Sequence, residues 1–434
     1  MKILEHVFHL TEQGTTIRRE LLGALTSFLS VAYILFVTPS YLSQTGMDYT
    51  GVLLATCLSS ALACFLSAAL NLPFILAPRV GLNAIFTYTL CLAMGYTWEQ
   101  ALAIVSLSGL TYLLISVTPL REQMISCIPQ SMKNAISAGL GLLISFTGLL
   151  SSGLVRAEGG ALLLGTETPA TFLALLGLLT IGVLMARKVK GAILIGIAVT
   201  TFFGFPLGVV QMPQSISLSL ASLRPLVLSP DFGGVLSLGV LPLVTAVIAF
   251  TMCLCFDTSG SLACIAGEED GLKEKEDLGR CKQKTVAVAL ATAAAPLLGA
   301  PAIGISVEDA ADATDRAKTG LYSAVTGVLF LAAAILAPIA AVIPEGAISP
   351  VLVLIGMLMI RNATNINWHQ VEIALPCFLI MITIPFTRSV VDGVGIGLIA
   401  YTVIGCICGK RKKISAVVYI LTILFVARYV LPMI

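Results

Sequence analysis

The sequence predicts an all-α polytopic membrane protein with 14 transmembrane segments in two inverted repeats of seven. Composition is the first observation: 57% of the residues are hydrophobic and 11% are charged, whereas soluble proteins carry about 25% charged residues. Long apolar runs recur along the chain, and one Pro/Gly-containing pattern occurs in each half. These features together place most of the chain in a lipid bilayer.

Apolar runs of roughly 17 to 25 residues can each cross a bilayer as a helix. The first half has such runs at 22–44, 50–71, 76–95, 99–118, 129–151, 169–186 and 191–212. The second half has them at 236–262, 284–299, 302–317, 319–343, 346–361, 370–387 and 389–408. The third and tenth runs are broken by Pro and Gly, so each is expected to begin with a short extended piece before a short helix.

Two segments beside these runs are expected to lie outside the 14-span unit. The apolar run 414–434 is short and contains Arg428, which favours an interfacial or tail helix over a further span. The Lys/Glu-rich stretch 268–284 favours a solvated cytoplasmic loop.

The distribution of basic residues supports this segmentation. With the N-terminus inside, most of the 25 Lys and Arg residues fall in cytoplasmic loops, as expected for a membrane protein. Seven is odd, so two homologous halves must have opposite orientations, as in many transporters. The pairs Gly109 and Gly327, and Pro119 and Pro338, recur at similar spacing in the two halves.

Several function classes are excluded. There is no basic patch with interleaved aromatic residues, so nucleic acid is not an expected partner. The eleven cysteines are scattered without metal-ligand spacing, so neither disulfides nor a metal site is expected. No nucleotide-binding or hydrolase motif is present, and neither a cofactor nor an enzymatic activity is predicted.

The broken runs point to a candidate substrate site. The stretch 77–83 lines up with 300–306, and paired broken segments of this kind commonly form transporter binding sites. Glu308 and Asp309 follow within apolar sequence, where charges are usually functional. A carboxylate there can accept hydrogen bonds from the ring N–H groups of a base, and a buried Glu can take up a coupling proton. The alternative is that both acids lie solvated at the edge of a loop.

Asp257 is the strongest acid outside the tenth run, because it follows about twenty apolar residues. The alternative is an acid at a helix end near the membrane interface. Thr258, Ser259 and Ser306 can hydrogen-bond a base or bond back to their own helix.

At these residues the chain resembles the nucleobase:cation symporter 2 family, the xanthine/uracil permeases, and in particular its AzgA-type adenine/guanine/hypoxanthine branch. The similarity covers nearly the whole chain. Its motifs are Arg19-Glu20, the stretches 25–29, 32–37, 71–74, 81–84 and 190–196, Phe256-Asp257-Thr258 with Gly260, and Val307-Glu308.

The resemblance implies two domains, each drawn from both halves of the chain. A core domain comprises 1–128 and 236–343, and a gate domain comprises 129–235 and 344–434, which includes the C-terminal apolar tail. Substrate would bind between them and move by sliding of the core against the gate. The expected location is the inner (plasma) membrane, and the basic loops place both ends of the 14-span unit in the cytoplasm.

The resemblance also implies a purine base as substrate and a proton, or another cation, as coupling ion. Glu308 and Asp257 match the base-binding and proton-linked acids, and Asn83 matches an Asn of the third segment. Ser306 and Thr258 are further candidate substrate-binding residues. The oligomeric state is left open, with a homodimer among the options.

The chain departs from the family pattern at several positions. Arg79 replaces a Gly, Asp309 replaces a Ser, and Leu254 replaces an Asp. We expect an ion pair between Arg79 and Asp309, since their segments are related by the repeat and one charge compensates the other. Such a pair would leave Glu308 and Asp257 free for substrate and proton. The alternative is that Arg79 binds an anionic substrate, as in anion transporters or exchangers of the same fold.

Overall fold

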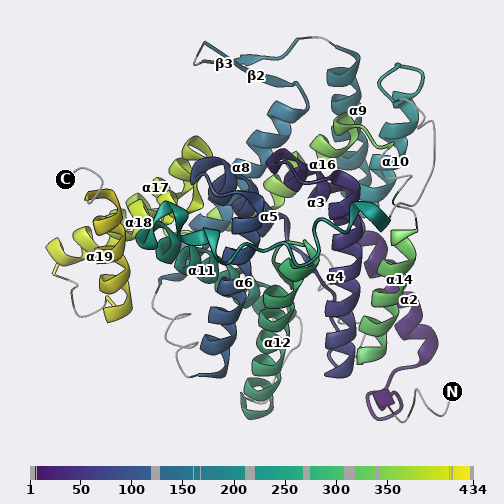
Figure 1. Cartoon of the computed structure of the whole chain (residues 1–434), viewed down its shortest axis with the longest axis horizontal. Helices are drawn as coiled ribbons and strands as arrows, with labels where there is room; N and C mark the ends of the chain where they lie inside the picture. Colours follow the sequence, from purple (N-terminus) through teal and green to yellow (C-terminus); the bar gives the residue numbers. More distant parts are fainter. Residues whose placement is uncertain are drawn as a thin grey trace.

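The structure is a computed structural model, and the helices dominate it (Figure 1). It describes residues 5, 7–118, 128–159, 161–166, 168–210, 220–266, 274–306, 318–335, 337, 342–409, 411 and 414–430. In this part, eight helices are long and apolar enough to cross a membrane, and five shorter apolar helices accompany them. The prediction of a polytopic helical membrane protein is confirmed at this level.

The first half begins with helices whose N-termini are capped by polar side chains. Thr16 and Asp48 accept hydrogen bonds from Arg19 N and Gly51 N, and Thr97 forms a capping box with Gln100. The elements are α2 (Ile17–Val31), α3 (Ile34–Leu42), η1 (Ser43–Thr45), α4 (Tyr49–Ala69), β1 (Leu76–Pro78), α5 (Val80–Ala84), the π-helix η2 (Ile85–Ala93), α6 (Trp98–Val117), α8 (Gln130–Ser151), β2 (Val155–Glu158), β3 (Ala161–Leu164), α9 (Pro169–Ala186) and α10 (Ala192–Gly204).

The described part of the second half also consists mainly of long helices, with one short strand, β4. Its elements are η3 (Leu220–Ser222), η4 (Gly234–Leu238), α11 (Val240–Ala266), α12 (Glu274–Ala294), η5 (Ala295–Leu298), β4 (Ile303–Ile305), α14 (Gly320–Ala334), α16 (Glu345–Ile360), η6 (Arg361–Asn365), α17 (Val371–Thr387), α18 (Val390–Ile407) and α19 (Ala416–Val430).

One local expectation is wrong, and one local element was not predicted. Residues 274–284, expected in a solvated loop, form the first part of α12. Lys, Glu and Leu are strong helix formers, so their polarity indicates solvent but does not oppose a helix. The antiparallel hairpin β2–β3 was not expected, and its apolar residues Leu162, Leu163 and Leu164 are exposed. Figure 1 shows this hairpin at the top of the molecule.

The extended pieces expected in the third and tenth segments are confirmed. Leu76, Ala77 and Pro78 pair antiparallel with Ile305, Gly304 and Ile303, respectively, so β1 and β4 form one two-stranded ladder. The ladder satisfies backbone groups that an apolar interior would otherwise leave unpaired. The hydroxyl of Thr292 on α12 donates to Ile303 O at 2.7 Å, and that of Ser261 on α11 donates to Ile305 O at 3.4 Å.

The helices pack in pairs around this ladder. α4 packs along α14 and α6 along α12, while α8 packs along both α16 and α17. Glycines allow close approach at these crossings: a Cβ on Gly109 would lie 2.5 Å from Ala293 N, and one on Gly327 would lie 2.8 Å from the Phe65 ring. At the crossing of α8 and α16, Gly141 and Gly356 approach each other's backbone.

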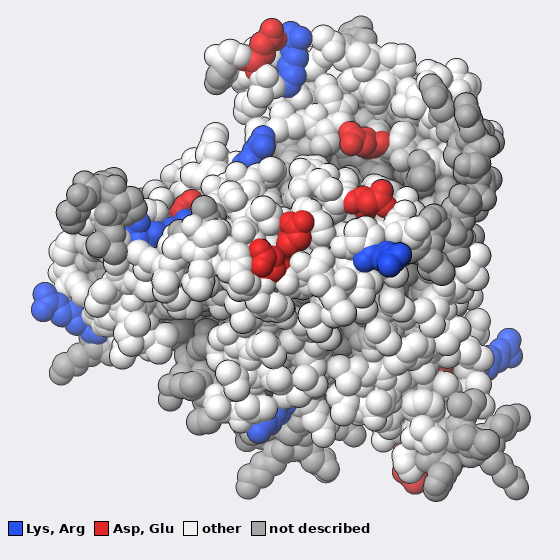
Figure 2. All heavy atoms as spheres, viewed as in Figure 1, with Lys and Arg blue, Asp and Glu red and all other residues white. Residues whose placement is uncertain are grey.

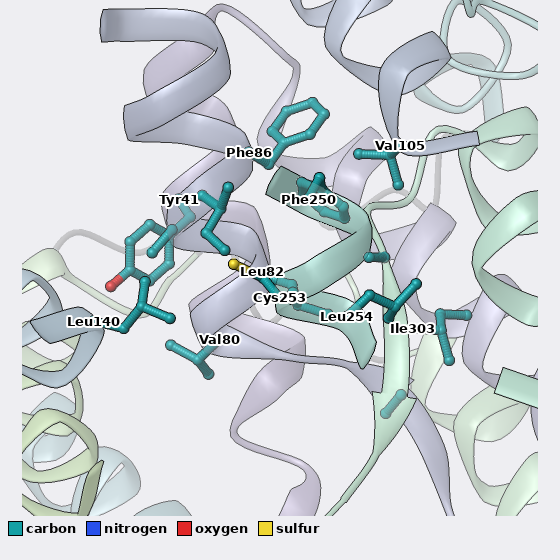
Figure 3. Packing of buried hydrophobic residues seen from close by; sticks show 14 of the residues in the cluster. Tyr41, Val80, Leu82, Phe86, Val105, Leu140, Phe250, Cys253, Leu254 and Ile303 are labelled. Atoms are coloured by element: carbon teal, nitrogen blue, oxygen red, sulfur yellow. The ribbon is translucent and has the colours of Figure 1, made fainter. Parts of the chain in front are cut away.

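The interior and the surface are both largely apolar. In the core close-up, Val80, Leu82 and Phe86 of the broken third segment lie among Leu140 of α8 and Phe250 of α11 (Figure 3). On the face shown in Figure 2, charged side chains are few and scattered among uncharged atoms. This surface fits a protein whose helices contact lipid.

Candidate functional site

The candidate site is centred on an ion pair between the two halves of the chain. Arg79 follows β1 in extended backbone and precedes α5, while Asp257 lies on α11. Arg79 Nε lies 3.3 Å from Asp257 Oδ2 and 3.4 Å from Oδ1, and Nη2 donates to Oδ1 at 3.4 Å. The side chains are 17% and 24% exposed, respectively. A guanidinium that engages both carboxylate oxygens fixes orientation as well as charge.

The pair lies directly on strand β4. A Cβ on Gly304 would lie 2.6 Å from Arg79 Cγ and 2.9 Å from Asp257 Oδ2, closer than neighbouring side chains tolerate. Gly304 pairs with Ala77 in the ladder, one residue before Pro78. The absence of a side chain at this position therefore lets the ion pair pack against the backbone.

Two buried polar side chains of the broken segments retain an unpaired atom within the described part of the chain. Asn83 Nδ2 donates to Thr38 Oγ1 at 2.9 Å, but Asn83 Oδ1 has no hydrogen-bond partner. Ser306 N donates to Ile75 O at 3.1 Å, while its hydroxyl also lacks a partner. Leaving such a group unsatisfied costs about 1–3 kcal/mol, so both atoms are suited to a polar ligand.

The hydroxyls that follow Asp257 bond to their own helix. Thr258 Oγ1 donates to Leu254 O at 2.8 Å, and Ser259 Oγ donates to Cys255 O at 2.7 Å. Both hydroxyls thus bond back to α11 in this structure, and a contact of either residue with a base stays a prediction.

The surroundings of α5 lead from the ion pair to helices α8 and α16. A Cβ on Gly81 would be in ordinary contact with Leu140 of α8 and Met359 of α16. Lys133 Nζ of α8 lies 5.6 Å from the centre of the Phe256 ring, next to Asp257 in sequence. The ion pair is thus close to the boundary between α5 and α11 on one side and α8 and α16 on the other.

The remaining predicted acids lie outside the described residues. Glu308 and Asp309 belong to 307–317, so the expected pairing of Arg79 with Asp309 stays a prediction. The accompanying expectation that Asp257 would be free of an ion pair is wrong, because Arg79 contacts it. Asp257 is distant in sequence, and apolar sequence alone does not show which acid a neighbouring segment approaches.

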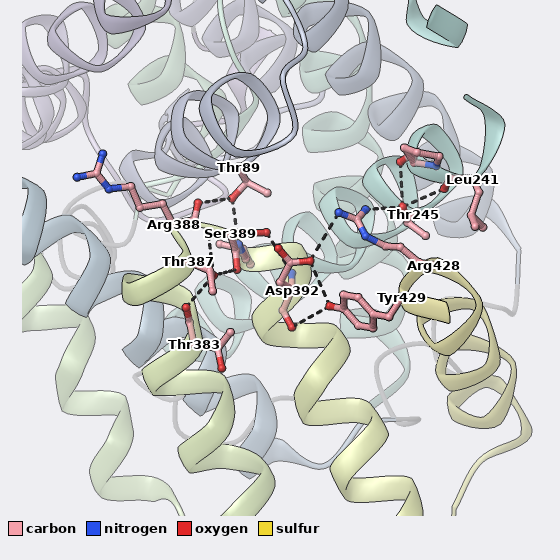
Figure 4. A network of polar contacts seen from close by, with 12 residues as sticks. Thr89, Leu241, Thr245, Thr383, Thr387, Arg388, Ser389, Asp392, Arg428 and Tyr429 are labelled. Carbon is pink, nitrogen blue, oxygen red and sulfur yellow. Dashed lines mark hydrogen bonds and ion pairs between the residues drawn. The ribbon is translucent and has the colours of Figure 1, made fainter. Parts of the chain in front are cut away.

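A second polar cluster was missed by sequence reasoning. Arg428 of α19 donates to Thr245 Oγ1 of α11 at 2.8 Å, and its Nη2 lies 3.6 Å from Asp392 Oδ1 of α18 (Figure 4). Tyr429 OH donates to Asp392 Oδ1 at 3.1 Å. Close by, Thr89 Oγ1 of η2 accepts from Val390 N at 3.0 Å. The sequence signal that could have indicated this cluster is Arg428, a single arginine in the apolar run 414–434.

No group of three or more His, Cys, Asp or Glu residues that could hold a metal ion occurs among the described residues. The polar atoms at the break between β1 and β4 offer charge and hydrogen bonds to a ligand. Apolar helices built around such a break define a membrane transporter.

The comparisons with known proteins agree with this class. A model of the Permease family, of the xanthine/uracil type, matches residues 18–396. The chain belongs to this permease family, and it is a transporter and not an enzyme.

Similar proteins extend over almost the whole chain. A permease of Methanocaldococcus jannaschii is 36% identical over 99% of this chain and 99% of its own length. The adenine permease AdeP of Escherichia coli is 32% identical over 99% of this chain and 96% of its own. The guanine/hypoxanthine permease PbuO of Bacillus subtilis is 33% identical over 96% and 98%. The resemblance seen in the sequence motifs is confirmed.

Solved structures share the fold at low sequence identity. The transmembrane domain of a cyanobacterial bicarbonate transporter, BicA, has a TM-score of 0.59 with 15% identity over 89% of this chain and 97% of that chain. The murine anion transporter Slc26a9 in its inward-facing state has a TM-score of 0.65 with 10% identity over 91% and 69%.

Proposed function

We propose that this protein imports a purine nucleobase of the hypoxanthine, guanine or adenine class by proton symport. The observation that carries the proposal is the pair of broken segments: Ser306 directly follows β4, Asp257 contacts Arg79 beside the ladder, and Asn83 lies one helical turn after Arg79 on α5. Relatives over nearly the full chain length are named as adenine and guanine/hypoxanthine permeases. A base offers ring N–H donors and ring acceptors, which carboxylate, amide and hydroxyl groups can match.

The site residues take distinct roles in this proposal. Glu308 and Asp257 supply the acidic groups that accept from the base or carry a proton. Asn83 Oδ1 and the Ser306 hydroxyl, which lack partners in the described part of the chain, bind the polar edges of the base. Thr258, whose hydroxyl already donates to Leu254 O, contributes only an acceptor.

The 14 spans and the inverted repeat belong to the same proposal. The packing of α6 on α12 corresponds to that of α14 on α4 when the halves are exchanged, and Gly109 and Gly327 occupy these two crossings. In the same way, the packing of α17 on α8 corresponds to the packing of α9 on α16. In this scheme the core domain (1–128 and 236–343) moves against the gate domain (129–235 and 344–434), giving alternating access.

The membrane orientation follows from the basic loops. We place both ends of the 14-span unit in the cytoplasm of a cell whose inner (plasma) membrane holds the protein, since the positive charges gather there. Labelling of the exposed Cys408 by an impermeant thiol reagent tests this placement. Modification in intact cells would contradict it, and modification only after permeabilisation is expected.

One observation favours a second function, transport of an anion. Arg79 supplies a cation at the break, and two solved structures that share the fold are a bicarbonate and an anion transporter. The contact with Asp257 opposes this reading, because the carboxylate neutralises the guanidinium that would bind the anion.

Uptake of labelled hypoxanthine, guanine and adenine by cells that lack their own permeases tests the proposal. Unlabelled bases are expected to compete, and bicarbonate and sulfate are not. Glu308→Gln is expected to abolish uptake with normal membrane expression, because an amide cannot carry the proton. Uptake of labelled anion without uptake of any base would establish the alternative. Base uptake that is unchanged in Glu308→Gln would remove that residue from the mechanism.

A further inference from the structure

The ion pair of Arg79 and Asp257 is built into the ladder between the two halves of the chain. Arg79 directly follows β1, and Asp257 lies one helical turn before Ser261, whose hydroxyl bonds to β4. Gly304 of β4 packs beneath both side chains. The partners are therefore attached to one paired unit of backbone, and their contact does not depend on how α8 or α16 is placed.

The charge state of Asp257 depends on the groups around it. An opposite charge within contact distance favours the ionised form of a carboxyl group, whereas burial without a partner favours the neutral form. A guanidinium does not lose its proton in proteins. Arg79, which reaches both oxygens at 3.3–3.4 Å, thus supplies a permanent charge at this position.

Other titratable and charged groups of the described residues also lie around α11. The thiol of Cys253 lies one turn before Asp257, and Lys133 of α8 lies over the adjacent ring of Phe256. On α18 and α19, Asp392 and Tyr429 belong to the cluster of Arg428, which donates to Thr245 of α11, about three helical turns from Asp257. Arg79 is the described cation in direct contact with the carboxylate.

We propose that Arg79 is a positioning residue that keeps Asp257 ionised throughout transport, so that the coupling proton is carried by another group. The inference rests on the proposed symport and assigns its chemistry. A proton-carrying acid must alternate between a charged and a neutral form, and a fixed guanidinium opposes that alternation. Asp257 then orients the substrate as a constant acceptor, and Glu308 is left as the acid of the sequence motif that can titrate.

The pH dependence of purine uptake by proteoliposomes tests the inference. Wild type, Arg79→Lys, Arg79→Gln and the double variant Arg79→Gln/Asp257→Asn are compared with labelled hypoxanthine. In Arg79→Gln we expect an additional loss of uptake of about tenfold per pH unit as the pH falls, because Asp257 without the guanidinium takes up a proton and no longer serves as the ionised acceptor. Arg79→Lys and the double variant should keep the shape of the wild-type pH profile, because neither has a carboxyl group at position 257 that lacks a neighbouring cation.

Two results would overturn the inference. One is an Arg79→Gln profile identical to that of wild type. The other is loss of the wild-type pH dependence in the single variant Asp257→Asn, measured alongside the four proteins, which would make Asp257 the proton carrier. A profile that returns to wild type only in the lysine and double variants supports the countercharge role, since a merely structural role predicts no such pattern.

A second readout is independent of transport. The midpoint of thermal unfolding in detergent is measured against pH for the same four proteins. In Arg79→Gln the carboxyl group that has lost the guanidinium binds a proton more readily when folded than when unfolded, so the unfolding midpoint of this variant should fall as pH rises relative to wild type. The double variant should remove that extra slope. If wild type takes up no purine, the proposed function fails, whereas equal slopes in all four proteins would refute the countercharge itself.

Discussion

The protein contains two arginine–aspartate pairs of similar exposure but different connections. Arg79 and Asp257 are 17% and 24% exposed, and Arg428 and Asp392 are 17% and 27% exposed. The first pair joins the β1–α5 junction to α11, segments already linked through the ladder. The second belongs to α18 and α19, and Arg428 also reaches Thr245 of α11.

The comparison shows that two similar ion pairs can have different effects, one on the charge of a side chain and the other on the relative position of helices. Within one packed unit, the pair of Arg79 and Asp257 sets the charge of a carboxylate. Between helices of separate segments, the Arg428 cluster instead fixes the position of α18 and α19 relative to α11. Substitutions in the first pair should therefore alter pH dependence and binding, and those in the second should alter rates of conformational exchange.

Arg79→Ala should have the largest effect. It leaves a partly buried carboxylate without its countercharge, which costs about 3 kcal/mol for a pair of this kind. We expect loss of uptake and a lower unfolding midpoint in detergent. Arg361→Ala, at an exposed arginine of η6, serves as the control and should change neither. Equal midpoints for the two variants would show that the ion pair contributes nothing to stability.

Gly304→Ala should have the next largest effect. Its Cβ would lie 2.6 Å from Arg79 Cγ, and overpacking of this kind costs about 1–3 kcal/mol. Uptake should fall, and its pH profile should shift toward that of Arg79→Gln. Gly260→Ala on α11 is the matched control, because a Cβ there meets nothing within 4 Å. Wild-type kinetics in Gly304→Ala would mean that the ion pair of Arg79 and Asp257 does not depend on its packing against the backbone of β4.

Arg428→Ala should act on rate. It removes the contact with Asp392 and the hydrogen bond to Thr245, each a charged interaction, and hydrogen bonds of this type contribute about 1.5–3 kcal/mol. The maximal rate of uptake should change, while the apparent KM and the pH profile stay near those of wild type. A changed KM with an unchanged maximal rate would contradict the distinction between the two pairs.

Tyr429→Phe should have the smallest effect. It removes one hydroxyl, which donates to Asp392 Oδ1 at 3.1 Å, at a cost of about 1 kcal/mol. The unfolding midpoint should fall less than in Arg428→Ala, and uptake should be close to normal. A larger fall of the unfolding midpoint than in Arg428→Ala would identify Tyr429 as the residue that contributes most to the contact between α18 and α19.

The sequence predicted local backbone well and long-range partners poorly. The Pro and Gly residues around Leu76–Pro78 and Ile303–Ile305 indicated extended pieces, since these residues interrupt a helix wherever the fold places them. The partner of Arg79 lies far along the chain, and which acid it meets depends on the register of α11 against β4. Arg428 was interpreted as an obstacle to membrane insertion because Asp392, its partner, is on another helix.

The ladder of β1 and β4 also bears on how the protein is made. Ile305 is synthesised roughly 230 residues after Leu76, which at 5–20 residues per second is on the order of 10–50 seconds. Until then the backbone of Leu76–Pro78 has no strand to pair with, and its amide groups remain unsatisfied in an apolar setting. The first half of the newly made chain therefore cannot reach its final state alone. We expect the first half to stay in contact with the insertion machinery until β4 is made. A chain truncated before β4 should be degraded.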